Sequence, residues 1–153
     1  MIQAVKNFRG LKFRQQIIFE NKSIQIINDS KSTSYSSSIK ILREKRNIYW
    51  LIGGIPKKGD KFILPRNYYK NIKGYIFGRN KKKFLFDLQN KIQIKKFLNL
   101  KDAWITLSED IKIDKLKKKT ILFSPAAASF DDFKNFEDRG EYFNQLVKKY
   151  KSA

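Results

Sequence analysis

Three polar loops hold the side chains in this sequence that could bind a charged ligand, and they span residues 28–33, 53–60 and 124–130. Lys31 and Lys57 would supply positive charge. The hydroxyls of Thr33 and Ser129 would supply hydrogen-bond donors. Donors of this kind bind carboxylates and phosphates. The loops contain no nucleophile paired with a base, so the sequence predicts binding of a small dicarboxylate or a phosphate rather than covalent catalysis.

Each loop also has a purely structural interpretation. Thr33 or Ser34 can cap a following helix, and Gly53-Gly54 can simply turn the chain. Ser129 is followed three residues later by Asp132, which is the spacing of a capping box, so Ser129 is predicted to cap the C-terminal helix. The free backbone N–H groups at the start of that helix would then add to the anion-binding capacity of the third loop.

One segment comes close to a nucleotide-binding motif. Gly54–Gly59 has the glycine spacing of a phosphate-binding P-loop, G-x-x-x-x-G-K-[ST]. The next two residues are Asp60 and Lys61, where the motif needs Lys and then Ser or Thr. Because an aspartate at this position repels phosphates, we reject the match. The sequence contains no Walker A motif and no G-x-G-x-x-G motif.

Alternating apolar and polar segments predict the elements that position these loops. Apolar and β-branched runs predict strands at residues 16–19, 24–28, 48–53, 74–77, 92–97 and 120–124, the first two joined by a hairpin turn at 20–23. Helical patterns cover residues 39–46, 82–88 and 101–111. The C-terminal segment is the clearest helix, because its apolar residues recur at three- and four-residue spacing: Phe133, Phe136, Phe143, Leu146, Val147 and Tyr150.

Strands separated by helical segments predict an α/β fold: one domain with a mostly parallel sheet flanked by helices. In an open sheet of this kind, ligands bind outside the carboxyl ends of the strands. Each of the three polar loops follows a predicted strand. We therefore expect the loops to converge on one crevice.

The composition restricts the chemistry further. The 153 residues include neither Cys nor His, which excludes thiol and imidazole catalysis, disulfides and the usual zinc sites. The net charge of +20 suits nucleic-acid binding, but 27 Lys stand against only 7 Arg, and the basic residues spread along the whole chain. We therefore predict a solvated basic surface and no specific nucleic-acid partner, with a basic nucleic-acid-binding module as the alternative.

Targeting signals are also missing from the pattern. No apolar run is long enough for a membrane span, and no secretory signal is visible after Met1. A cytoplasmic protein with no membrane partner is expected.

Four segments resemble the C-terminal domain of the Mur ligases and, within that family, the branch that adds D-glutamate. They span residues 8–14, 28–33, 53–57 and 124–140. The last is the most specific, because it begins Ser-Pro-Ala and ends Phe-Lys-Asn-Phe-Glu-x-Arg-Gly. The resemblance implies a Rossmann-like domain at 11–153 that receives the incoming amino acid. It also implies that residues 1–10 are the tail of the last helix of a central ATPase domain.

The resemblance implies roles for individual residues. Those that fall where the family binds D-glutamate are Thr33, Lys57, Ser129, Phe130 and Phe136. The first three hold the carboxylates, the fourth contributes its backbone, and the fifth packs beside the ligand. Lys58 directly follows Lys57, so it is the alternative for the inward-pointing lysine.

The nucleotide contacts implied by the resemblance are Arg14 and Asp29, with Asp29 placed to accept hydrogen bonds from the ribose hydroxyls. Lys31 lies nearer the reacting phosphate and is the implied catalytic residue. The family usually has His just before this arginine, whereas this sequence has Phe13. An adenine or ribose contact is therefore lost or replaced by stacking.

The implied reaction is ATP-dependent amide bond formation in peptidoglycan precursor synthesis. ATP phosphorylates the L-alanyl carboxylate of UDP-N-acetylmuramoyl-L-alanine, and the amine of D-glutamate attacks the acyl phosphate. ATP and Mg²⁺ would be bound mainly by the central domain, so no metal ligand is assigned in this sequence. The chain alone is predicted to lack ATPase and ligase activity. A related ligase similar to the folylpolyglutamate synthetases is the alternative within the superfamily.

Overall fold

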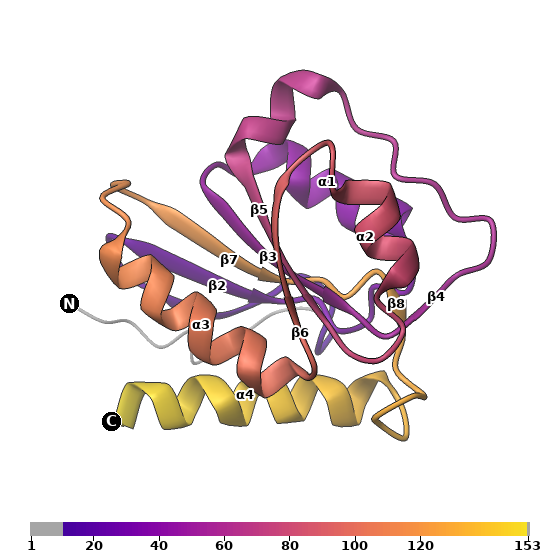
Figure 1. The fold of residues 1–153 in the computed structure, drawn as a ribbon. Helices are drawn as coiled ribbons and strands as arrows, with labels where there is room; N and C mark the ends of the chain where they lie inside the picture. The colour runs from indigo at the N-terminus through magenta and orange to yellow at the C-terminus, as the bar shows by residue number, and fades with distance from the viewer. Residues whose placement is uncertain (1–10, 153) are drawn as a thin grey trace.

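The computed structural model describes residues 11–152 (Figure 1). Its main sheet has six strands: β1 Gln16–Glu20, β2 Ile24–Asn28, β3 Ile48–Gly53, β5 Ile72–Phe77, β6 Gln93–Phe97 and β7 Lys119–Phe123. They lie in the order β1-β2-β7-β3-β5-β6, with β1 antiparallel to β2 and all other neighbours parallel. The predicted α/β class with a mostly parallel sheet is confirmed.

The hairpin turn between β1 and β2 follows from one side chain. The Asn21 side chain accepts hydrogen bonds from the backbone N–H groups of Ser23 and Ile24, both at 2.8 Å. An asparagine that bonds to the backbone two or three residues ahead makes a tight turn without glycine. The predicted turn at 20–23 is therefore confirmed, together with its physical cause.

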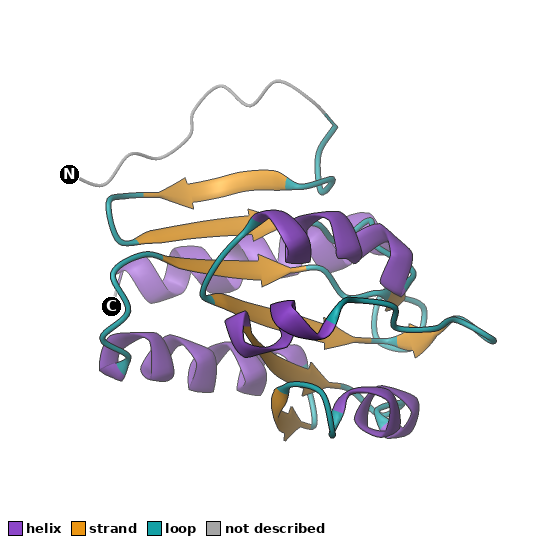
Figure 2. Ribbon diagram, turned by 90° about the horizontal axis from the view of Figure 1, so that it is seen from above, coloured by secondary structure: helices purple, strands orange, loops and turns teal. Residues whose placement is uncertain are grey.

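Helices cover both faces of the sheet (Figure 1, Figure 2). They are α1 Tyr35–Glu44, α2 Lys82–Leu88, α3 Leu100–Ile113 and α4 Phe136–Ser152, with a 3₁₀ turn, η1, at Arg66–Asn71. Apolar residues of α1 and α2 pack in one buried cluster, and those of α3 and α4 pack in the other. The three-layer arrangement expected of βαβ units is thus present.

Successive side chains of the central strands point to opposite faces of the sheet, so each strand contributes to both clusters. Trp50 and Ile52 of β3 face α1 and α2, whereas Tyr49 and Leu51 face the opposite layer. All are buried, which explains why the run from Ile48 reads as continuously apolar.

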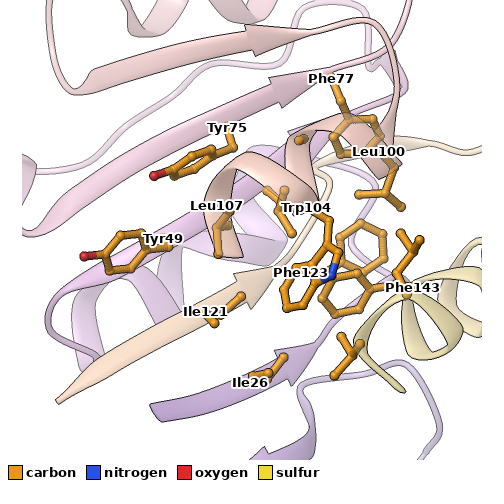
Figure 3. Packing of buried hydrophobic residues seen from close by; sticks show 14 of the residues in the cluster. Ile26, Tyr49, Tyr75, Phe77, Leu100, Trp104, Leu107, Ile121, Phe123 and Phe143 are labelled. Carbon is orange, nitrogen blue, oxygen red and sulfur yellow. The ribbon is translucent and has the colours of Figure 1, made fainter. Parts of the chain in front are cut away.

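On the α3 and α4 side, aromatic side chains dominate the packing (Figure 3). The ring of Phe123 stacks on Phe143 with centroids 4.4 Å apart, and Trp104 meets Phe143 edge to face at 5.4 Å. Burying each side chain of this size stabilises the fold by about 1.5–3 kcal/mol. The contacts fix α4 against the end of β7, which is where the third polar loop begins.

The start of the C-terminal helix differs from the prediction. α4 begins at Phe136, and the side chain of Asn135 accepts a hydrogen bond from the Asp138 N–H at 2.8 Å. Ser129 does not cap this helix: its carbonyl accepts from the N–H groups of Asp132 and Phe133 in a turn. The sequence holds two successive capping patterns, Ser129 with Asp132 and Asn135 with Asp138, and the later one caps the helix. The prediction of free helix N–H groups directly after Ser129 is therefore wrong.

One further feature of the fold was not predicted from the sequence. β4 (Ile55–Pro56) and β8 (Ala127–Ala128) form a separate two-stranded antiparallel pair, with Ile55 opposite Ala128 and Pro56 opposite Ala127. The predicted helical tail at residues 1–10 lies outside the described residues.

Candidate functional site

The three polar loops lie side by side at one end of the sheet. The first follows β2, the second follows β3, and the third follows β7. Since β7 lies between β2 and β3 and runs parallel to both, their carboxyl ends meet at the same edge. The expected convergence of these loops is confirmed (Figure 1).

Asp29 joins the first loop to the third. Its backbone N–H donates to the Phe123 carbonyl at 2.7 Å, and its carboxylate accepts from the Ser124 hydroxyl at 2.8 Å. The other carboxylate oxygen accepts from the Gln15 N–H at 3.1 Å. Burial raises the pKa of Asp29 to about 6, although the hydrogen bond from Ser124 and the nearby charge of Arg14 act to lower it. Asp29 therefore holds the first loop against the third through hydrogen bonds inside the domain. Its contact with a ribose stays a prediction.

The second loop is joined to the third by backbone pairing. In addition to the β4–β8 pair, the Gly53 N–H donates to the Pro125 carbonyl at 3.1 Å. Gly54 has φ +127°, and a Cβ at this position would lie 2.4 Å from the Ala128 carbonyl oxygen. Only glycine fits here, so the Gly53-Gly54 pair makes the close approach of the two loops possible.

Arg139 connects α4 to the first and third loops, and no role was predicted for it from the sequence. Its side chain is 1% exposed, and it donates to the Ser30 hydroxyl at 3.1 Å, to the Ser30 carbonyl at 2.5 Å and to the Ala127 carbonyl at 2.9 Å. Burial lowers the pKa of the guanidinium to about 10, and the nearby carboxylates of Asp131 and Asp29 counter this shift. It lies three residues after Phe136 and four before Phe143. A charged residue on the apolar face of an amphipathic helix was the signal that could have revealed it.

Asn28 and Ser30 attach the first loop to the beginning of α4. The Asn28 side-chain amide donates to the Gly140 carbonyl at 3.0 Å and to the Asn144 side chain at 2.8 Å. The Ser30 hydroxyl donates to the Phe136 carbonyl at 2.7 Å. The end of β2, the first loop and α4 therefore behave as one bonded unit.

Phe13 takes a different position from the one expected of a nucleotide-stacking residue. Its ring is buried against α4, where a Cβ on Gly140 would come within 2.3 Å of it. Its carbonyl accepts a hydrogen bond from the Lys31 N–H at 2.9 Å. The alternative of stacking on adenine is therefore wrong for this ring, because its faces are taken up by packing inside the domain.

Other predicted ligand residues remain open to solvent. The ammonium of Lys31 lies over the ring of Phe136, 4.9 Å from its centroid, so the structure brings these two together. The side chain of Phe130 is 71% exposed. Arg14, Thr33, Lys57 and Lys58 are also exposed.

Ser129 differs from these residues in its burial. The residue is 3% exposed, and its hydroxyl forms no hydrogen bond within residues 11–152. The hydroxyl oxygen itself is not sealed from solvent, because Asn71 Nδ2 is the one fully buried side-chain polar atom without a partner among the described residues. A hydroxyl without a protein partner that solvent can still reach is suited to bind a ligand group.

The segment that resembled a P-loop has a different geometry. A P-loop leads from a strand directly into a helix, whereas Gly54 leads here into β4 and its pairing with β8. Asp60 is turned toward α1, where its carboxylate accepts from the Tyr35 N–H at 2.7 Å. The rejection of this motif is confirmed.

Among the described residues, no group of three or more acidic side chains could hold a metal ion, and no helix could span a bilayer.

Comparison with known proteins relates this fold to the Mur ligases. No protein-family model matches the chain. The fold is similar to that of MurF from Acinetobacter baumannii, with a TM-score of 0.58 and 16% sequence identity over 78% of this chain and 28% of that one.

The sequence is more specific. The chain is 35% identical over its whole length to the UDP-N-acetylmuramoylalanine--D-glutamate ligase of Wolbachia sp. subsp. Brugia malayi, of which it covers 30%. The Rhodospirillum rubrum protein of the same name is 32% identical over 96% of the chain, which covers 31% of that protein. The chain thus spans about a third of the length of these relatives. Its sequence is similar to that of these ligases and its fold to that of MurF, so the resemblance inferred from its motifs is confirmed.

Proposed function

We propose that this chain is the amino-acid-binding domain of a UDP-N-acetylmuramoylalanine--D-glutamate ligase, corresponding to positions 11–153. The similarity along the whole chain to ligases of that name supports this branch. It favours D-glutamate over the substrate of a folylpolyglutamate synthetase-like ligase, and it favours a ligase over a nucleic-acid-binding module.

The observation that carries the proposal is that hydrogen bonds join the three polar loops at one edge of the sheet. Thr33, Lys57 and Ser129 come from different loops, and Asp29, Arg139 and the β4–β8 pair hold those loops together. D-Glutamate carries two carboxylates. A lysine ammonium and two hydroxyls on separate loops can bind both of its ends, which fixes the orientation of the amine between them. Phe130 and Phe136 would supply the apolar contact for the aliphatic part of the ligand.

The domain contributes orientation and charge to the reaction. The D-glutamate amine attacks the acyl phosphate of UDP-N-acetylmuramoyl-L-alanine, and negative charge develops on the tetrahedral intermediate before phosphate leaves. Lys31 is assigned to stabilise this charge, because its ammonium lies beside Phe136 at the proposed amino-acid site. Arg14 is assigned to the adenine nucleotide, because its charge lies close to Asp29 at the rim of the same loop. ATP and Mg²⁺ supply carboxylate activation, and their main ligands are assigned to other domains.

A titration of the isotope-labelled chain with D-glutamate tests this assignment. We expect D-glutamate to shift the amide signals of Thr33, Lys57 and Ser129 more strongly than L-glutamate does. A charge-assisted hydrogen bond is worth about 1.5–3 kcal/mol, so Lys57→Ala should weaken binding by about tenfold or more.

Lys58→Ala is the matched control, because it removes a neighbouring exposed ammonium and should leave the affinity nearly unchanged. If only Lys58→Ala abolishes binding, the lysine assignment is off by one residue. If D-glutamate shifts none of the three loops in the folded wild-type chain, the proposed function is refuted.

A further inference from the structure

Asp60 makes contacts that the proposed function does not yet use. It ends the second loop, and its carboxylate accepts from the N–H of Tyr35, the first residue of α1, at 2.7 Å. Its own backbone N–H donates to the Lys57 carbonyl at 3.1 Å. Tyr35 comes two residues after Thr33, and Asp60 comes three residues after Lys57. A single residue therefore ties the turn that carries Lys57 to the segment that carries Thr33.

A closed network holds Asp60 in place. The Lys83 ammonium donates to the Asp60 carbonyl and to the Asp87 carboxylate, both at 2.7 Å. Asp87 also accepts from the Tyr35 hydroxyl at 2.8 Å. Tyr35 is 1% exposed, and Lys83 lies over its ring at 5.4 Å from the centroid. The network starts and ends on Tyr35, so α1, α2 and the second loop are fixed relative to one another.

The turn that carries Lys57 has little other support. The β4–β8 pairing ends at Pro56, one residue before Lys57. Gly59 has φ +77°, and no atom lies within 4 Å of the position that a Cβ would occupy there. The side chains of Lys57 and Lys58 form no hydrogen bond or ion pair with residues 11–152. Asp60 is therefore the anchor of this turn on the side away from β4.

We propose that Asp60 is a positioning residue of the amino-acid site, which sets the location of Lys57 relative to Thr33. This inference rests on the proposed function. It also explains why an acidic residue is compatible with a site for a dicarboxylate. The negative charge of Asp60 is directed to the N-terminus of α1, where the helix dipole favours it, and Lys83 lies beside it.

Two substitutions at Asp60 and one distant control separate positioning from stability. Asp60→Ala removes the acceptor for the Tyr35 N–H, whereas Asp60→Asn keeps a carbonyl oxygen in nearly the same place. The control is Asp114→Ala, which removes a carboxylate bonded to Tyr49 and to Lys73 at the opposite end of the sheet. Each variant is titrated with D-glutamate by NMR, and the dynamics of the Lys57 amide are measured in the same samples.

We expect Asp60→Ala to raise the dissociation constant for D-glutamate by about tenfold, because small displacements of a binding group are costly. Asp60→Asn should restore most of the affinity. In Asp60→Ala, the order parameter of the Lys57 amide should fall while that of Ala127, in the β4–β8 pair, is retained. Asp114→Ala should lower the urea midpoint without changing the dissociation constant.

Two results would overturn the inference. Either Asp60→Ala binds D-glutamate as tightly as the wild type, or Asp114→Ala weakens binding to the same extent, which would show that lost stability alone is responsible. A wild-type chain that is folded but binds no D-glutamate refutes the proposed function and this inference together. A wild type that binds, with an equally competent Asp60→Ala, refutes this inference alone.

Discussion

Replacing Arg139 by methionine is the most direct test of how the site is held together. The substitution keeps an unbranched, apolar side chain in α4 but removes every donor. The carbonyl oxygens of Ser30 and Ala127 then lose hydrogen bonds of 2.5 and 2.9 Å in a buried region. Each buried acceptor left without a partner costs about 1–3 kcal/mol. The variant no longer has to bury a charged guanidinium, whose desolvation lowers the pKa of Arg139, and this offsets part of the loss. We therefore expect the free energy of unfolding to fall by about 3 kcal/mol.

Urea unfolding followed by circular dichroism measures this difference. Arg79→Met is the matched control, since Arg79 also donates to a backbone carbonyl, that of Asp131 at 2.6 Å, but its side chain is 69% exposed. An exposed arginine of this kind contributes at most about 1 kcal/mol. If Arg139→Met unfolds at the same urea concentration as Arg79→Met, the view of Arg139 as the buried link among the loops is incorrect.

Two further predictions concern Asp29 and the cap of α4. Because burial raises the pKa of Asp29 from 3.8 to about 6, its protonated form is favoured in the folded chain, and the stability it contributes below pH 3.8 is lost as the pH rises through 6. Relative to Asp29→Asn, the wild type should therefore lose about 1 kcal/mol of unfolding free energy between pH 5 and pH 8, and equal changes in both proteins would contradict this. Asn135→Ala should cost about 1 kcal/mol because it removes the cap of α4. Ser129→Ala should leave the melting midpoint nearly unchanged, and the reverse order would restore Ser129 as the cap.

The layered fold could be predicted because its signals are local. The apolar run at Ile48–Gly53 and the periodic face of α4 each reflect burial of one element, which depends little on the rest of the chain. Strand order is different. β7 lies between β2 and β3, and only long-range pairing determines this, so no pattern within one segment could reveal it.

The site was predictable to the extent that it depends on parallel strands. Once three polar loops follow three such strands, their convergence is a geometric consequence. The residues that hold the loops were not visible in the same way, because Arg139 and Asp60 act through partners far away in the sequence. The β4–β8 pair has two residues in each strand, which is too short for any periodicity. The cap of α4 was misplaced because the Ser129 and Asn135 patterns are equally good locally.

The strand order determines when contacts within the sheet can form as the chain is synthesised. The β1–β2 hairpin is made early, but its neighbour in the sheet, β7, emerges from the ribosome only after β3, β5 and β6. Arg139, which fixes the first loop to α4, follows later still. The first polar loop is therefore made before the partners in β7, the third loop and α4 that hold it, and long-range pairing of this kind forms slowly. The bonds that join the first and third loops through Arg139 can form only after α4 has been made, when it packs on residues that were made first.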